Sequence, residues 1–211
     1  NAEDLTLAAG TAGLTGTGTS GNNVLTDLGN ANTLIGGDGD DTFDFMDAGF
    51  DGADVVNDSG DTDVMNATID DNSVGNLTIT GVETFNWDVS TGGCNTLLEM
   101  MGVTDVTNIN LSGDIGGNLE LKNLVNGVDF MFTDLFGSLE IRPQDTSGTA
   151  DSMNIVTTDS DVDLTVANVE MFNFIANGSN TLDVGGINGD NPVVLIFDGA
   201  GAQFLAINNI D

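Results

Sequence analysis

The stretch of sequence that decides the fold is Gly36-Gly37-Asp38-Gly39-Asp40-Asp41-Thr42-Phe43-Asp44. Its glycines permit a tight turn whose backbone carbonyls are directed at a cation, and Asp41 adds a carboxylate. Phe43 then begins a short strand with an inward apolar side chain. Because hard cations prefer oxygen ligands, this stretch predicts a metal-binding turn followed by a strand.

The same pattern recurs upstream with a period of nine residues. The position of Phe43 is occupied by Leu34 and Leu25 in the two upstream copies, and the position of Asp41 by Asn32 and Asn23. Gly39 has a counterpart in Gly21. One intact nonapeptide therefore follows two degraded copies.

The intact copy fits every fixed position of the pattern G-G-x-G-x-D-x-U-x, in which U is a large apolar residue. Over residues 16–54 the chain resembles the RTX-type secreted proteins, whose β-rolls bind calcium at such turns. The resemblance implies two nonapeptides per coil, so that turns eighteen residues apart stack on one another. The turn Gly18–Asn23 would then lie against Gly36–Asp41, with Asn23 and Asp41 near one shared calcium ion.

The predicted metal ligands lie on both sides of the roll. On the first side they come from the two stacked turns and are Gly21, Asn23, Gly37, Asp38, Gly39 and Asp41. On the second side the turn Asp27–Asn32 would face the region that contains Asp47, Asp51 and Asp54. Asp58 lies outside the nonapeptide and is expected to be remote from the first site. The alternative is a Gly- and Asp-rich surface turn that binds no metal.

The composition favours divalent cations as partners. The chain has 34 acidic residues against two basic ones, Lys122 and Arg142, and its formal net charge is −32. We expect neither nucleic acid nor an anionic membrane as a partner, because both require Lys or Arg to meet phosphate. Repulsion of this size opposes a compact state unless calcium or high salt neutralises it. Asp far outnumbers Glu, and Asp is the acidic residue of calcium turns and tight loops.

The rest of the sequence predicts short strands. Apolar and polar residues alternate in many runs, for example Leu77–Ile79, Val106–Leu111, Leu119–Leu121, Phe130–Phe132, Leu139–Ile141 and Val193–Phe197. This period of two, with turns rich in Gly, Asn and Asp, favours an all-β fold, a right-handed parallel β-helix or β-roll solenoid. The dipeptides Asn126-Gly127, Asn177-Gly178 and Asn188-Gly189 keep a β-sandwich as the alternative. Asn95–Gly102 is the one plausible helical turn, and no apolar run is long enough to insert into a membrane.

A longer repeat covers the second part of the chain. Four blocks recur in order at an offset of 85 to 88 residues, with 59–66, 77–87, 95–97 and 113–124 repeated as 147–154, 164–174, 180–182 and 199–210. We therefore predict a β-roll segment over 1–54 and β-helical repeats over 55–211, at about 59–146 and a truncated 147–211. One continuous solenoid is expected, as a fragment of a longer chain. Stacked coils would form asparagine ladders, with the candidate pairs Asn66/Asn154, Asn86/Asn173 and Asn123/Asn209.

The sequence contains no recognisable catalytic arrangement. Without histidine a Ser-His-Asp or Cys-His site is impossible, and Cys94 has no such partner to activate it. One tryptophan and no tyrosine leave no aromatic cluster for stacking on sugars. The chain is therefore predicted not to be an enzyme.

The pattern Asp-x-Met-Asn followed by Val-Glu-x-Phe-Asn, at 63–66 and 82–86, widens the resemblance. Together with the nonapeptide it is similar to the calcium-dependent surface-layer proteins of Gram-negative bacteria. That resemblance implies type I secretion, folding on calcium outside the cell, and self-assembly into a cell-surface sheet, with a surface polysaccharide as a further partner. The alternatives are a fragment of a large RTX adhesin or extracellular filament, and the C-terminal secretion domain of an RTX enzyme.

Overall fold

The protein is described by a computed structural model that covers residues 4–45, 50–70, 75–93, 95–144, 152–167, 169, 171–188, 194–200 and 203–210. All regular structure in these residues is β-strand, as the all-β prediction requires. The strands are β1 (Asp4–Leu7), β2 (Thr15–Thr17), β3 (Val24–Asp27), β4 (Thr33–Ile35), β5 (Thr42–Phe45), β6 (Val55–Asn57), β7 (Val64–Ile69), β8 (Gly75–Thr80), β9 (Thr84–Thr91), β10 (Thr96–Val103), β11 (Asn108–Leu124), β12 (Asp129–Pro143), β13 (Ser152–Thr158), β14 (Asp161–Ala167), β15 (Met171–Asn177), β16 (Asn180–Asn188), β17 (Val194–Ala200) and β18 (Gln203–Ile210).

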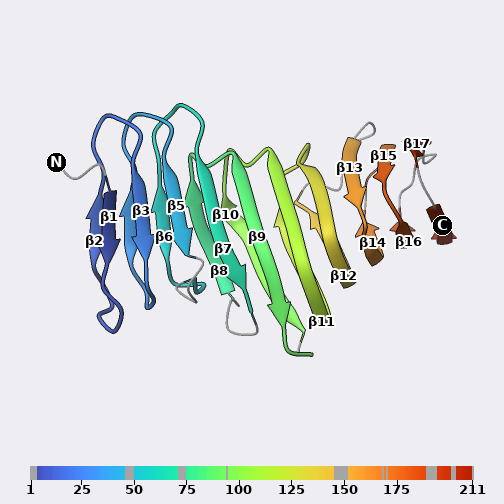
Figure 1. Cartoon of the computed structure of the whole chain (residues 1–211), viewed down its shortest axis with the longest axis horizontal. Coiled ribbons are helices and arrows are strands. Elements are labelled where there is room, and N and C mark those ends of the chain that lie inside the picture. The colour runs from blue at the N-terminus through green and yellow to red at the C-terminus, as the bar shows by residue number, and fades with distance from the viewer. Residues whose placement is uncertain are drawn as a thin grey trace.

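The strands stack in parallel into a β-solenoid (Figure 1). One stack, here called the odd stack, holds β1, β3, β5, β7 and β9, the first halves of β11 and β12, and then β13, β15 and β17. The even stack holds β2, β4, β6, β8 and β10, the second halves of β11 and β12, and then β14, β16 and β18.

Every pairing between described strands is parallel, which confirms the solenoid and makes the β-sandwich alternative wrong. The dipeptide Asn126-Gly127 joins β11 to β12, and Asn177-Gly178 joins β15 to β16, so each passes the chain from one stack to the other. Gly127 and Gly178 do adopt positive φ, of 81° and 74°. The turn chemistry was therefore predicted, whereas the antiparallel hairpin that it suggested is absent from these positions. Gly189 of the third dipeptide lies outside the described residues.

The predicted helical turn at Asn95–Gly102 is also wrong, because residues Thr96–Val103 form strand β10. Leu98 and Met100 are buried on alternate positions, whereas Met101 points outward and is exposed. The backbone of β10 pairs with β8 on one side and with β11 on the other. These long-range hydrogen bonds override the weak local preference for a helix.

The core lies between the two stacks and consists of columns of side chains in register. One column on the odd stack contains the buried residues Leu25, Phe43, Met65, Phe85, Ile109 and Phe130. Aromatic pairs within single strands add to it: the rings of Phe85 and Trp87 stack with centroids 5.1 Å apart. Each coil thus buries side chains against the coil before it and the coil after it.

Asparagine ladders run along the outside of the odd stack, but between neighbouring coils. Asn86 donates to Asn66 at 3.0 Å, and Asn110 donates to Asn86 at 2.7 Å. A second ladder joins Asn173 to Asn154 at 3.2 Å. The ladders themselves were predicted, whereas their partners are the next coils and not the equivalent positions of the long repeat.

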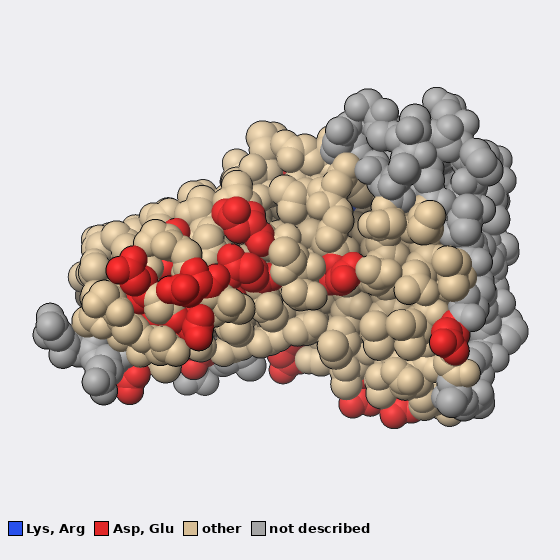
Figure 2. All heavy atoms as spheres, turned by 90° about the horizontal axis from the view of Figure 1, so that it is seen from above, with Lys and Arg blue, Asp and Glu red and all other residues tan. Residues whose placement is uncertain are grey.

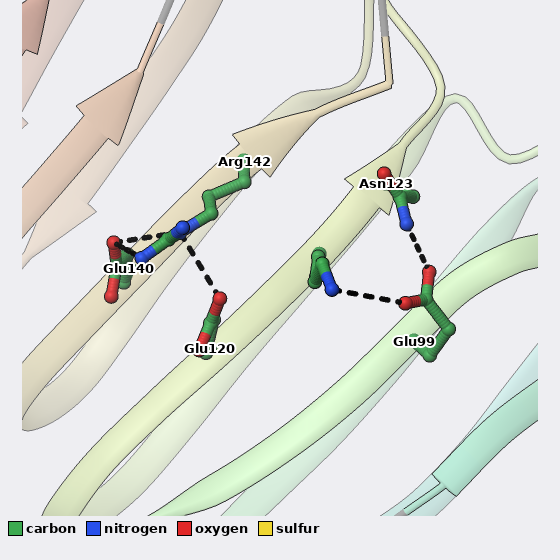
Figure 3. A network of polar contacts seen from close by, with 6 residues as sticks. Glu99, Glu120, Asn123, Glu140 and Arg142 are labelled. Atoms are coloured by element: carbon green, nitrogen blue, oxygen red, sulfur yellow. Dashed lines mark hydrogen bonds and ion pairs between the residues drawn. The ribbon is translucent and has the colours of Figure 1, made fainter.

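The only two basic residues of the chain lie side by side on the outer face of the even stack (Figure 3). Arg142 contacts Glu140 at 2.6 Å and Glu120 at 3.0 Å, and Lys122 lies 3.7 Å from Glu99. Glu99 also accepts a hydrogen bond from Asn123 at 2.6 Å, while the side chain of Asn209 lies outside the described residues. Both cations are therefore engaged with the glutamates of neighbouring coils.

The chain passes from β5 to β6 and onward in one series of coils, so strands on both sides of residue 54 belong to the same stacks. The domain boundaries proposed from the sequence stay predictions. Among the residues that the structure describes, no helix is long and apolar enough to cross a membrane.

Candidate metal centre

A ladder of acidic and amide side chains runs along one edge of the solenoid, here called the first edge. It is formed by the last residue of each turn that leads from the even to the odd stack. Each side-chain oxygen accepts a hydrogen bond from the backbone N–H of the equivalent residue one coil earlier: Asn23 donates to Asp41 at 2.7 Å, Asp41 to Asp63 at 2.7 Å, and Asp63 to Glu83 at 2.8 Å. One oxygen of each Asp in the ladder is therefore used to hold two coils together.

The second carboxylate oxygens of this edge converge. Asp41, Asp58 and Asp63 each offer an oxygen, and these atoms lie within 4.8 Å of one another. The side chains of Asp41 and Asp63 are only 1% and 0% exposed. The Oδ2 atoms of all three residues are buried without a hydrogen-bond partner. Buried charged oxygens normally have hydrogen-bond or ionic partners. The three unpartnered Oδ2 atoms therefore indicate a site for a ligand.

Gly36 makes room for the cluster. A Cβ atom at this position would collide with Oδ2 of Asp58 and with Oδ2 of Asp41. The next residue, Gly37, has φ +121° and donates its N–H to Asp58 at 3.3 Å. Gly36 thus allows the backbone to approach two carboxylates closely, which a residue with a side chain could not do, and Gly37 supplies the positive φ of the turn.

The electrostatics of the cluster also favour a cation. Desolvation by burial raises the pKa of Asp41, raises that of Asp58 to about 6 and raises that of Asp63 to about 7. Repulsion between the neighbouring carboxylates adds to this shift for Asp58 and Asp63. Three ionised carboxylates cannot share such a space without a counter-charge, so either protons or a bound cation must neutralise them.

The sequence-predicted ligands on this edge are placed as follows. Asn23 stacks on Asp41, but its carboxamide serves its own turn, since it accepts from the N–H of Thr19 at 2.5 Å. Gly39 lies against Gly21, as expected for stacked turns, and its N–H is bonded to Asp61 at 3.0 Å. Asp38 is exposed to solvent. The converging oxygens beside Asp41 therefore come from the following coil and not from the preceding one.

Asp58 was expected to be remote from this site, and that expectation is wrong. Asp58 and Asp63 were missed because their turn lacks the full glycine pattern. A signal was present nonetheless: the segments Gly36–Asp41 and Asp58–Asp63 are both six residues long, and each ends in Asp two positions before an inward apolar residue.

The second edge of the solenoid holds another acidic group, but its oxygens are already partnered. Asn32 donates its carboxamide to Asp27 at 3.0 and 3.1 Å and its backbone N–H to Asp54 at 2.9 Å. The N–H of Asp51 donates to the other oxygen of Asp54 at 2.8 Å. Burial raises the pKa of Asp54 to about 7. This edge is organised by amides, and Asp47 lies outside the described residues.

Comparison of the chain with family models, with curated proteins and with solved structures finds no match. The function is therefore argued from the geometry of the first edge together with the sequence.

Proposed function

We propose that the chain is a calcium-dependent structural solenoid that is secreted and assembles into a bacterial surface layer. The observation that carries this proposal is the group of three converging, buried and unpartnered carboxylate oxygens of Asp41, Asp58 and Asp63. A cation there would join two consecutive coils, because Asp41 precedes β5 whereas Asp58 and Asp63 belong to the turn before β7.

The donor set supports calcium as this cation. All three ligands are carboxylate oxygens, and the chain has no histidine. Such hard ligands suit calcium or magnesium and do not suit zinc or copper. Calcium tolerates an irregular shell of six to eight oxygens, which turn carbonyls and water would complete, whereas magnesium requires a near-ideal octahedron.

The role in secretion follows from the linkage between the ion and the fold. Extracellular calcium modules bind at about 10⁻⁴ to 10⁻³ M, so a site of this class is empty inside the cell and filled outside it. A ligand that binds only the folded state stabilises that state by mass action. The first edge would therefore keep the acidic coils loose before export and close them afterwards.

The test is titration calorimetry with calcium on the intact chain and on Asp63→Asn. This substitution keeps an oxygen that can accept from the N–H of Asp41 but removes one charge from the cluster. We expect the calcium affinity to fall at least about tenfold, because a charged ligand is lost.

The matched control is Asp161→Asn, which removes the same charge from an exposed position of β14. A further variant, Asp38→Asn, tests the exposed candidate ligand of the nonapeptide. Equal calcium affinities for Asp63→Asn and Asp161→Asn would contradict the proposal.

A further inference from the structure

The two outer faces of the C-terminal coils differ in charge. On the even stack, Asp161 and Asp163 are exposed, and Asp183 pairs in register with Asp163. On the odd stack, the outward residues of β13 and β15 are neutral, as are Met131 and Thr133 of β12. This area is bordered by acidic residues, with Asp129 and exposed Asp134 on β12 and exposed Asp198 next to Ile175 on β17. A neutral area of this kind is notable in a chain with a net charge of −32.

The neutral area is also apolar. Met131, Val156 and Ile175 are successive neighbours in one row that crosses three strands. Two further apolar side chains lie beside this row. Ile196 on β17 is on the next row, which also holds Asn154 and Asn173, and Met171 on β15 is one row beyond it. Met131, Met171, Ile175 and Ile196 are 45%, 40%, 36% and 48% exposed. We call these five residues the neutral face.

The same row is polar in the earlier coils. Upstream of Met131 it continues as Asn110, Asn86 and Asn66, which satisfy one another by hydrogen bonds along the ladder. At β12 the row changes from amides to large apolar side chains. Several large apolar side chains that stay exposed side by side indicate a surface that a partner covers.

We propose that the neutral face is an interface between two copies of this chain, with the same face contributed by each copy. The proposal rests on the assembly role argued above and names the surface that performs it. Charge decides the occupant: a basic partner would bind the acidic face of β14 and β16, whereas the neutral face complements only another uncharged apolar surface. The second copy offers such a surface, with Asp129 and Asp198 at its two ends and uncharged residues between them.

The geometry suits a face-to-face contact. Two flat sheets pack with their surfaces about 10 Å apart when apolar side chains interdigitate between them. A two-fold axis through the neutral face would place Met131 of one copy near the apolar residues of β15 or β17 of the other. Interfaces that use the same patch on both copies close into dimers, which further contacts can then join into a sheet.

The test is sedimentation velocity of the full chain in excess calcium over a range of concentrations. We expect the chain to form dimers, and the double variant Met131→Asp/Ile175→Asp to raise the dimer dissociation constant by more than about tenfold, because buried apolar anchors dominate interfaces. The control Asn76→Asp/Thr78→Asp adds the same charge to exposed positions of β8 on the even stack and should leave dimers intact.

Circular dichroism verifies that each variant is folded, and the single variant Met171→Asp replaces the double variant if that one is not. Calcium calorimetry on the same samples separates the two proposals, since loss of dimers with unchanged calcium binding supports the neutral face alone. A chain that stays monomeric at every concentration, or a folded Met131→Asp/Ile175→Asp variant that dimerises like the control, would overturn the interface.

Discussion

The N-terminal coils and the later coils of this solenoid differ in strand length and in the size of the apolar core that each coil buries. Strands β2 to β6 are only three or four residues long. The inward residue of β2 is Gly16, and β3 to β6 each contribute only one or two inward apolar side chains. Strands β9 to β12 have 8 to 17 residues and carry the stacked pair Phe85 and Trp87 and the pair Phe130 and Phe132. The strands accordingly lengthen from β2 toward β11 and β12 (Figure 1).

The distribution of charge follows the same division. Seen from above, acidic side chains gather over the narrow N-terminal part, while the wider part of this view is mostly free of them where it is described (Figure 2). The Asp41, Asp58 and Asp63 cluster and the hydrogen-bonded group of Asp27 and Asp54 both belong to the narrow coils. Among the described residues, the buried acids Asp27, Asp41, Asp54 and Asp63 all lie in residues 27–63, whereas the acidic residues of the later coils are half-buried or exposed. A small core thus coincides with sites that a ligand can stabilise.

The largest expected difference between the two regions concerns calcium removal. With chelator, we expect hydrogen exchange to lose its protection throughout β2 to β6, because the unbalanced carboxylates of Asp41, Asp58 and Asp63 repel one another there. Protection in β9 to β12 should persist, since the aromatic core of these strands involves no such cluster. Mass spectrometry of exchange with and without calcium resolves the two regions. Full protection of β2 to β6 without calcium would show that the N-terminal coils do not depend on a bound cation.

The next expected effect is a loss of stability in the later coils that does not depend on calcium. Phe132→Ala removes a fully buried ring of β12 and should lower the free energy of unfolding by about 3–5 kcal/mol. The loss should be the same at low and high calcium, because the ring lies in the aromatic part of the core. Urea unfolding followed by circular dichroism at both calcium concentrations measures it. Thr133→Ala, at an exposed position of the same strand, is the matched control and should change stability far less.

The smallest expected effect is a pH dependence that belongs to the second edge. Burial raises the pKa of Asp54 from 3.8 to about 7, so the folded chain binds a proton there more tightly than the unfolded chain does. Its contribution to stability is therefore complete below pH 4 and is lost as the pH rises through 7. In excess calcium, lowering the pH from 8 to 6 should stabilise the fold by about 1.4 kcal/mol through this group.

Asp54→Asn cannot take up that proton and serves as the comparison. The part of the pH dependence of the urea midpoint that Asp54 causes should be absent from this variant, even if its absolute stability is lower. Identical slopes for the two proteins between pH 8 and 6 would show that Asp54 does not titrate in this range.

Local sequence determined the elements of this fold. Alternation of apolar and polar residues marked strands such as Phe130–Phe132, because a strand with one buried face needs a period of two wherever it lies. The nonapeptide marked the turn that ends at Asp41, since glycines that tolerate positive φ are needed there irrespective of the neighbours. The charge imbalance, with Lys122 and Arg142 as the only cations, pointed to a divalent cation from composition alone.

The tertiary structure decided which of these elements meet. Val24 pairs with Thr42, eighteen residues on, whereas Thr42 pairs with Val64, twenty-two residues on, because the chain between β5 and β6 is longer. This change of coil length sets Asp63 beside Asp41. The same long-range pairing made a strand of Thr96–Val103 and joined Asn66 to Asn86. The register between coils depends on backbone hydrogen bonds between residues that are distant in the sequence. A local sequence pattern does not determine the length of the coil between them, so it could not predict which residues pair.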